Sequence, residues 1–265
     1  MDNYYDRIAD LYDTTRSLPP EIEQQVTRFI LNLVSAHPSS RFLEPGIGTG
    51  LIAIPIIKQG YAYTGIDISA EMMAQIEHKL GSLPENLTLI QADAAALDFA
   101  DATFDVVLMR HFIHLVPDWR LALCEIQRVL KPQGFLLYCE SPWSPHQQEF
   151  EQHWRSFLNQ YDCFQPPGCE DRDRANLDKV KTWLTERGAT VEIAIAAQWP
   201  IQETVGDRLT LYATRDHATC WSISDEVFPE AIAAFKTWCI NHYGSTETVL
   251  SSEGRFSIVY ARKDD

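Results

Sequence analysis

The stretch Arg41-Phe-Leu-Glu-Pro-Gly-Ile-Gly-Thr-Gly50 decides the fold, because a short apolar segment runs into a carboxylate and then into three glycines at alternate positions. Glycine has no Cβ, so it adopts positive φ and lets backbone amides approach a bound molecule closely. The apolar run 51–57 predicts a helix over the site, with Pro55 bending it or delaying its start. A nucleotide-like cofactor is the first hypothesis.

The composition limits the class of protein. A chain of 265 residues with 45% apolar residues suits one large α/β domain, or such a domain with a sizeable insertion. Its formal net charge of −15 would repel phosphate backbones and anionic bilayers, so neither a nucleic acid nor a membrane is expected as a partner. The apolar runs are shorter than the ~20 residues of a membrane helix, and the first residues lack the features of a secretion signal. The expected location is cytoplasmic.

The cysteines indicate reduced thiols rather than disulfides or a metal site, because none of them forms a Cys-x-x-Cys pair. They are Cys124, Cys139, Cys163, Cys169, Cys220 and Cys239.

Between residues 41 and 140, strand and helix patterns alternate with short turns, which predicts a parallel sheet covered on both faces. Strands are expected near 41–44, 62–67, 87–91, 104–109 and 135–140. Ser69 is the predicted N-cap of a helix over 70–80, and a second helix is expected over 119–130.

The second half is less regular. Pro-rich stretches at 141–145 and 166–168 flank an amphipathic segment, 146–160, which predicts an inserted helical cap. Further expected elements are a helix at 172–187, strands at 190–197 and 255–262, and a helix at 225–243. The predicted organisation is an N-terminal helical lid, 1–40, and a domain at 41–265 with cap insertions at 141–170 and 199–253.

Two acidic residues sharpen the cofactor hypothesis. Asp67 ends the second strand about 20 residues beyond the first glycine, where a carboxylate can accept hydrogen bonds from a ribose diol. Glu44 ends the first strand, where it would repel a pyrophosphate but attract the ammonium of a methionine moiety. Leu51 also occupies the place of a dinucleotide motif's third glycine, so S-adenosylmethionine (SAM) is favoured over NAD.

The end of the third strand offers contacts for an adenine. Asp93 can accept a hydrogen bond from the adenine amino group while the Ala94 backbone reads the ring edge. Ile68 and Met72 either sandwich the adenine or belong to the core. Asp67 and Asp93 also have a structural alternative, as caps of the elements that follow them.

Several motifs together resemble class I SAM-dependent methyltransferases, in the small-molecule branch that includes ubiquinone and menaquinone biosynthesis enzymes. They are Glu44-Pro-Gly-Ile-Gly-Thr-Gly50, Gly65-Ile-Asp67, Gln91-Ala-Asp93, Phe104-Asp-Val-Val107 and Arg128-Val-Leu-Lys-Pro-Gln-Gly134. The resemblance spans most of residues 5–140. It implies an α/β, Rossmann-like, doubly wound sheet of seven strands, mostly parallel with an antiparallel last strand. The cofactor-binding residues that it implies are Glu44, Gly46, Gly48, Asp67, Asp93 and Ala94, and Gly50 completes the glycine loop.

The N-terminal segment Tyr4-Tyr-Asp-Arg-Ile-Ala-Asp-Leu-Tyr-Asp13 resembles the helix and loop that close over SAM in this branch. Tyr12 and Arg16 are therefore predicted lid residues at the cofactor. The alternative is that the aromatic residues simply pack, as they often do at helical spacing.

The fourth strand leads into Met109-Arg-His-Phe-Ile-His-Leu115 at the carboxyl edge of the sheet, where parallel sheets bind ligands. Arg110 is assigned to the cofactor, and His111 and His114 are the candidates for a general base. No third ligand with metal-site spacing accompanies the two histidines, so no metal is expected. Alignment of an activated methyl donor alone can supply ~7–11 kcal/mol, so a base is not indispensable.

The cap segments supply aromatic surface for a planar or apolar acceptor. These aromatic residues are Trp143, Trp154, Tyr161, Phe164, Trp199, Tyr212 and Trp221. The alternative, expected for most of them, is that they fill the core of the cap itself. The resulting hypothesis is a SAM-dependent methyltransferase that acts on O, N or C of a small metabolite. The alternatives are an NAD(P)-dependent oxidoreductase and a SAM-binding protein that does not transfer the methyl group.

Overall fold

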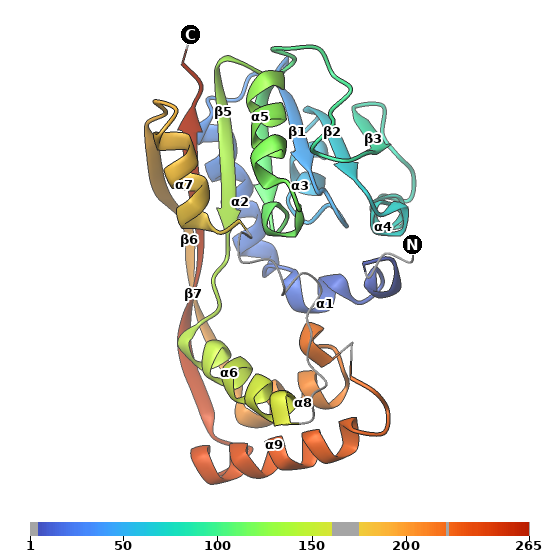
Figure 1. Cartoon of the computed structure of the whole chain (residues 1–265), viewed down its shortest axis with the longest axis vertical. Helices are drawn as coiled ribbons and strands as arrows, with labels where there is room; N and C mark the ends of the chain where they lie inside the picture. The colour runs from blue at the N-terminus through green and yellow to red at the C-terminus, as the bar shows by residue number, and fades with distance from the viewer. Residues whose placement is uncertain (1–4, 161–174, 221–222, 265) are drawn as a thin grey trace. The chain divides into compact units, whose positions relative to one another are not determined.

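A computed structural model describes residues 5–160, 175–220 and 223–264 (Figure 1). The chain forms two compact units. The first comprises residues 1–140, 171–197 and 256–265, and the second comprises residues 141–170 and 198–255. The predicted aromatic residues Tyr161, Phe164 and Trp221, and the cysteines Cys163 and Cys169, lie outside the described residues.

The sheet has seven strands in the order β3-β2-β1-β4-β5-β7-β6. Their bounds are β1 (Arg41–Pro45), β2 (Ala62–Asp67), β3 (Leu87–Gln91), β4 (Phe104–Arg110), β5 (Leu130–Glu140), β6 (Val191–Thr204) and β7 (Val249–Arg262). The first five strands run parallel, whereas β7 runs antiparallel to β5. The prediction of a mostly parallel, seven-stranded, Rossmann-like sheet is confirmed, because the chain order reverses beside β1, as in a doubly wound fold.

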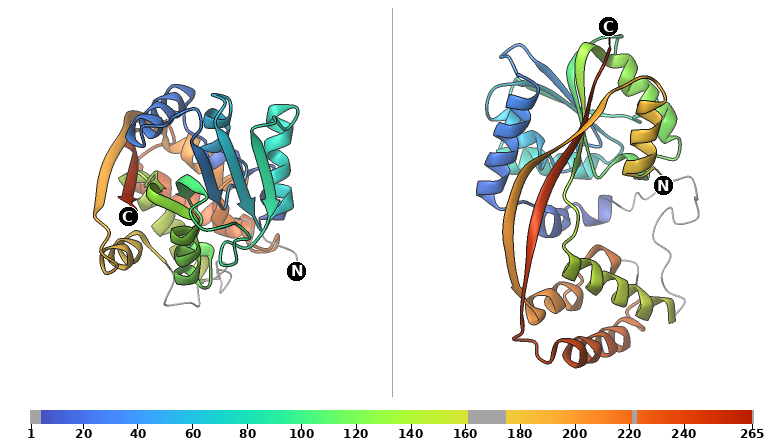
Figure 2. Two further views of the ribbon diagram at one scale, coloured as in Figure 1. Left: turned by 90° about the horizontal axis from the view of Figure 1, so that it is seen from above. Right: turned by 90° about the vertical axis from the view of Figure 1, so that its left-hand side faces the viewer.

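The helices of the first unit are η1 (Asp6–Ile8), α1 (Tyr12–Arg16), α2 (Pro20–Leu33), α3 (Ala53–Ile57), α4 (Ala70–Leu80), η2 (Ile113–Leu115), α5 (Trp119–Val129) and α7 (Leu177–Thr185). Figure 2 shows α2 on one face of the sheet and α5 with α7 on the other. The apolar sides of α5 and α7 form one core cluster with β4, β5 and β7, which includes Leu123, Val180 and Val259. The sheet is therefore buried on both faces, as its near-continuous apolar strands require.

Local sequence signals account for the helix ends near the glycine loop. Ser69 is the N-cap of α4, because its Oγ accepts a hydrogen bond from the Met72 amide at 3.1 Å. Gly81 ends α4 in the left-handed conformation, with φ of 78°. The helix after the glycines begins only at Ala53, so Pro55 lies in the first turn, where a missing amide donor costs nothing.

Several strands and helices, mostly in the second half of the chain, begin or end at other residues than the sequence predicts. β6 continues through Pro200 to Thr204, because an edge strand tolerates proline. α7 begins at Leu177 rather than 172, since the Asn176 side chain accepts from the Lys179 amide. β5 begins at Leu130 and β7 at Val249, both earlier than expected. A further helix, α8 (Val205–Ala213), was not predicted.

The second unit has its own core, built largely from aromatic rings. Its helices are α6 (Pro145–Gln160), α8, η3 (Ala218–Cys220) and α9 (Phe228–Tyr243). Phe235 lies at the centre, with ring centroids 5.1 Å from Trp154 and 5.0 Å from Tyr212. Phe150 contacts Phe235 edge to face at 5.9 Å. Trp154 and Tyr212 are thus core residues of this unit.

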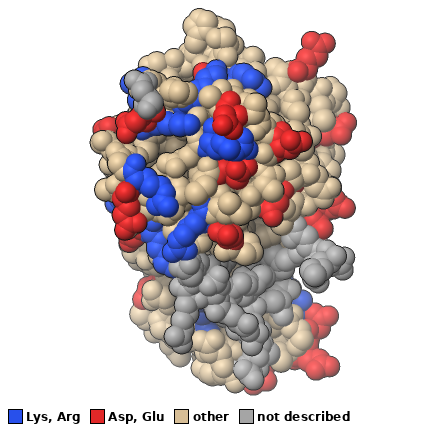
Figure 3. Space-filling model, turned by 45° about the horizontal axis from the view of Figure 1, so that its top comes forward, with Lys and Arg blue, Asp and Glu red and all other residues tan. Residues whose placement is uncertain are grey.

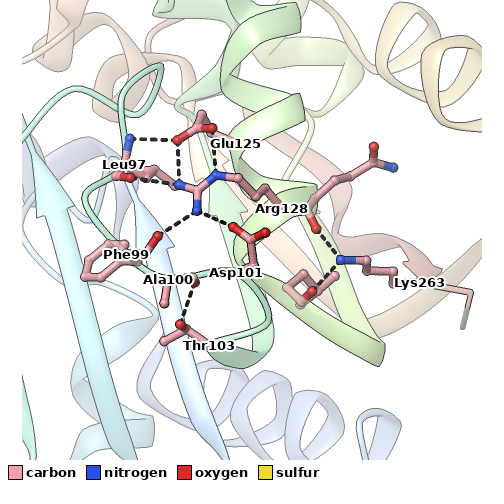
Figure 4. A network of polar contacts seen from close by, with 10 residues as sticks. Leu97, Phe99, Ala100, Asp101, Thr103, Glu125, Arg128 and Lys263 are labelled. Atoms are coloured by element: carbon pink, nitrogen blue, oxygen red, sulfur yellow. Dashed lines mark hydrogen bonds and ion pairs between the residues drawn. The ribbon is translucent and has the colours of Figure 1, made fainter.

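A polar network fixes the loop between β3 and β4, which follows the predicted adenine contacts (Figure 4). The Arg128 guanidinium donates to the carbonyls of Leu97 at 2.8 Å and Phe99 at 2.6 Å, and to Asp101 at 2.9 Å. It also pairs with Glu125 at 2.8 and 2.9 Å, and Glu125 accepts from the Leu97 amide. All three nitrogens of this arginine are in use.

Figure 3 shows Lys and Arg side chains interspersed with Asp and Glu side chains on the face that it draws. In the part of the chain that the structure describes, no helix is both long enough and apolar enough to cross a bilayer. Cytoplasmic location stays a prediction.

Four of the described cysteines are free thiols: Cys124, Cys139, Cys220 and Cys239.

Candidate functional site

The glycine loop between β1 and α3 forms one wall of a pocket in the first unit. Gly46 and Gly48 have φ of 69° and 53°, the left-handed region that favours glycine. A Cβ on Gly46 would lie 2.4 Å from the Phe112 ring, so no other residue fits there without displacing it. Three of the predicted site residues from other segments also line this pocket: Tyr12, Arg110 and His111.

Glu44 lies at the floor of the pocket. Its side chain is only 2% exposed and accepts a hydrogen bond from the Tyr63 hydroxyl at 2.6 Å. Burial raises the pKa of Glu44 to about 8, although the Tyr63 hydrogen bond opposes this change. The carboxyl group is therefore mostly protonated at neutral pH in the free protein, and a cation beside it would favour its ionised form. Sequence reasoning found Glu44 but not Tyr63, which reaches it from the neighbouring strand β2.

Asp67, at the end of β2, braces the glycine loop. One carboxylate oxygen accepts from the Gly48 amide at 2.8 Å, and the other accepts from the Ser69 amide at 2.9 Å. Burial raises the pKa of Asp67, and these amide hydrogen bonds oppose that rise. A carboxylate has about four lone-pair sites, so both oxygens retain capacity for hydroxyl donors. The structure thus joins the predicted ribose residue to the predicted glycine loop.

Arg110 and His111 enter the pocket from the end of β4. The Arg110 side chain is 7% exposed, and its Nη2 donates to the Arg16 carbonyl at 2.9 Å. His111 has a φ of 50°, a left-handed conformation that is uncommon outside glycine and often marks functional sites. Burial and the neighbouring Arg110 charge hold the pKa of His111 well below its usual range. His111 is therefore neutral near pH 7, and the same burial and charge weaken its affinity for a proton.

The N-terminal segment is fastened over the glycine loop by three aspartates. Asp6 accepts from the Ser69 hydroxyl at 2.5 Å, and Asp10 accepts from Gln75 at 2.8 Å. Asp13 bridges two partners, the Thr49 hydroxyl at 2.5 Å and the Lys79 ammonium at 2.7 Å.

These three aspartates were not predicted. Their signal in the sequence is the spacing i, i+4, i+7, which places acidic side chains on one side of a helical segment. Of the two predicted lid residues, Tyr12 lines the pocket and Arg16 reaches it through its backbone carbonyl, which bonds Arg110.

The other predicted residues do not line this pocket. Ile68 is 60% exposed, whereas Met72 is buried, with its methyl 3.3 Å from where a Gly48 Cβ would lie. Asp93 accepts from the Ala95 amide at 2.9 Å, and Ala94 belongs to the core.

Two more predicted residues also lie outside the pocket lining. Gly50 closes the loop with φ of 75°, and His114 lies in η2, one short turn beyond His111. The adenine contacts and a base at His114 stay predictions.

Comparison with known proteins bears on this geometry. Residues 43–138, from β1 to β5, match a family model described as a methyltransferase domain. This part of the chain is therefore similar to methyltransferase domains. The matched residues include the glycine loop, Glu44 and Asp67, and the pocket residues Arg110 and His111.

Two curated relatives resemble part of the chain. A demethylmenaquinone methyltransferase of Streptomyces avermitilis is 31% identical over 145 residues, 53% of this chain and 61% of that protein. A phosphatidylethanolamine N-methyltransferase of Cereibacter sphaeroides is 40% identical over 105 residues, 38% of this chain and 51% of that protein. The chain thus matches about half to three-fifths of the length of these relatives.

A solved structure supports the fold. The phosphoethanolamine N-methyltransferase 2 of Haemonchus contortus, in complex with phosphomonomethylethanolamine and S-adenosylhomocysteine, has a TM-score of 0.57 and 17% identity. The alignment covers all of this chain and 58% of that one.

Proposed function

We propose that this protein transfers the methyl group of SAM to O, N or C of a small-molecule acceptor. The observation that carries the proposal is the buried Glu44 beside the three-glycine loop. A cation beside Glu44 favours its ionised form, so this group can pair with the ammonium of SAM, whereas the pyrophosphate of NAD(P) gains no such pair, and the oxidoreductase alternative is disfavoured. The methyltransferase domain over residues 43–138 supports the same choice.

The residues present fit SAM in three respects. Gly46 and Gly48 line the pocket without a side chain, Asp67 has free acceptor capacity, and Arg110 has buried donors without a partner. Glu44 would hold the ammonium and Asp67 the ribose hydroxyls, while Asp93 with Ala94 would hold the adenine. When bound, SAM supplies a methyl group that is already activated by its sulfonium.

Catalysis in this proposal rests mainly on positioning. Alignment of donor and acceptor supplies ~7–11 kcal/mol, and the buried pocket wall excludes water from one side. His111 is the candidate for removing a proton from an acceptor hydroxyl or amine, because it is neutral near pH 7 and lines the pocket. A variant that lacks this imidazole should retain SAM binding and lose turnover.

We also infer roles for the two segments that surround the methyltransferase domain. The N-terminal residues 5–40 act as a lid, since Asp6, Asp10 and Asp13 fasten this segment to the glycine loop and α4. The second unit acts as a cap that selects the acceptor. Trp143 and Trp199 are partly exposed, unlike the buried Trp154 and Tyr212, and are the candidates for contact with a planar or apolar molecule.

The test is calorimetric titration of the protein with SAM, S-adenosylhomocysteine and NAD, followed by a screen of small-molecule acceptors. Binding of the first two ligands, followed by methylation of an acceptor, supports the proposal. Binding of NAD alone would replace it with the oxidoreductase. Tight SAM binding without turnover of any acceptor would instead favour a protein that binds SAM without transferring its methyl group.

A further inference from the structure

Arg110 is a buried arginine whose hydrogen-bonding capacity is mostly unused. Its Nη2 donates to the Arg16 carbonyl, but Nε and Nη1 are buried and have no partner among the described residues. Burying a donor without a partner costs free energy, and the cost is larger for a charged group. Burial also lowers the pKa of Arg110, so the folded protein holds this charge against a desolvation penalty.

A second arginine of the same unit shows the ordinary structural arrangement. Arg128 uses Nε, Nη1 and Nη2, and it pairs with the carboxylates of Glu125 and Asp101 (Figure 4). Arg110 lines the pocket instead, and no ion pair joins it to any carboxylate in the described segments. The unused donors of Arg110 therefore suit an anion that enters the pocket.

The same pocket also contains a group of the opposite kind. Glu44 lines it, is 2% exposed, and accepts a hydrogen bond from the Tyr63 hydroxyl. A ligand that carries only an anion would satisfy Arg110 but would be opposed by an ionised Glu44. A ligand that carries an ammonium and a carboxylate on the same carbon would satisfy both side chains.

We propose that Arg110 and Glu44 form a receptor for an α-amino-acid zwitterion, in which Arg110 binds the carboxylate of the methionine end of SAM. This inference rests on the proposed function, because it assigns one end of the same ligand. Arg110 is then a binding residue that discriminates SAM from cofactor fragments without the carboxylate. An anionic acceptor at Arg110 is the competing assignment, and the experiment below separates the two.

The experiment compares three ligands by calorimetry. SAM has the complete amino-acid end, decarboxylated SAM lacks only the carboxylate, and 5′-methylthioadenosine lacks the whole amino-acid end. The wild type should bind SAM about 10 to 100 times more tightly than decarboxylated SAM, as expected for charge-assisted hydrogen bonds. Equal affinity of the wild type for these two ligands would overturn the proposal without any variant.

Two variants give opposite patterns. Arg110→Met should weaken SAM binding about 10 to 100 fold and change the affinity for the other two ligands by less than about twofold. Glu44→Gln should weaken both ligands that carry an ammonium, SAM and decarboxylated SAM, and spare 5′-methylthioadenosine. The exposed Arg120, on α5, supplies the matched control Arg120→Met, which should change none of the three affinities.

Each other outcome is informative. An Arg110→Met variant that loses affinity equally for all three ligands would show that Arg110 shapes the pocket, and the proposal would be wrong. Unchanged SAM affinity with an increased KM for the acceptor would assign Arg110 to the acceptor. Wild type that binds none of the three ligands would instead refute the proposed function itself.

A stability measurement distinguishes a ligand-binding arginine from a structural one. Because the buried Arg110 charge is not paired, Arg110→Met should leave the unfolding midpoint of the ligand-free protein unchanged or raised. Arg128→Met should lower that midpoint, since it breaks the network with Glu125, Asp101, Leu97 and Phe99.

Discussion

At the glycine loop of the first unit, backbone amides and buried charges face a pocket, whereas in the second unit aromatic rings face one another. Glu44 and Arg110 are held at a cost to the folded state, since burial works against the charged form of each. Phe235, Trp154 and Tyr212 are held by burial that favours folding. Substitutions at the glycine loop should therefore affect mainly ligand binding, whereas substitutions in the aromatic core of the second unit should affect mainly stability.

The largest expected effect is on the stability of the second unit. Trp154→Ala removes a fully buried ring that contacts Phe235 and Tyr212, and it should lower the free energy of unfolding by about 3–5 kcal/mol. Urea denaturation followed by circular dichroism measures this loss. The control is Trp238→Ala on α9, a partly buried ring, which should cost less. Equal losses of unfolding free energy in the two variants would contradict this contrast, because burial would then not govern stability in this unit.

Glu44 should make stability depend on pH in an unusual direction. Its pKa in the folded protein, about 8, is above its ordinary value of 4.5, so between these values the native state binds more protons than the unfolded state. Stability from this group is therefore greatest below pH 4.5, falls as pH rises to about 8, and is constant above. Relative to Glu44→Gln, the wild type should lose at most about 1.4 kcal/mol per pH unit in this window.

Thermal denaturation of both proteins from pH 5 to pH 9 measures this difference. Parallel pH profiles for the wild type and Glu44→Gln would mean that Glu44 titrates normally. The contrast between the two units would then not hold at Glu44, because burial would not raise the pKa of this residue.

Asp67 should affect binding more than folding. Asp67→Asn leaves an amide in place of the carboxylate that braces Gly48 and is proposed to bind the ribose, so SAM affinity should fall tenfold or more. Isothermal titration calorimetry measures the dissociation constant, with the exposed Asp98→Asn as the control. If SAM affinity survives in Asp67→Asn, the ribose assignment must be abandoned.

The smallest expected effect is at the N-terminal segment. Asp13→Ala removes the hydrogen bond to Thr49 and a half-exposed ion pair with Lys79, which together should contribute about 1 kcal/mol or less. We expect a two- to fivefold weaker SAM affinity and more rapid proteolysis before α2, as the segment opens more often. The exposed Glu85→Ala is the control. An unchanged proteolysis rate would argue against a lid.

The comparison also explains what the sequence could predict. β2 and α4 were found at their observed bounds, because Asp67, Ser69 and Gly81 each carry a local signal of a strand end or a cap. β6 was cut short at the tryptophan and proline, since only the sheet order shows that it is an edge strand. α8 was missed although Thr204 and Asp207 form its capping box, because Gly206 lies between them and weakens the helical pattern.

The residues of the candidate site also fall into two groups, those that the sequence could predict and those that it could not. Residues in sequence motifs, such as Glu44 and Asp67, could be found, because each occurs at a strand end beside glycines. Tyr63 and the three N-terminal aspartates were not found, because they act through partners 19 to 66 residues away in the chain. The spacing of the aspartates indicates a shared face but not the residues that this face contacts. Arg110 was assigned to the cofactor by its position at a strand end, but its unused donors are visible only in three dimensions.

The long strands β6 and β7 have a consequence for how the protein opens. Each is 14 residues long, and each begins in one unit and ends in the other, changing unit after Ala197 and after Arg255. Amide hydrogen exchange reports the openings of such shared strands. If slow exchange continues across both junctions, each strand opens as one cooperative element. Binding of an acceptor that orders the second unit would then also reduce local opening of these strands at the edge of the sheet.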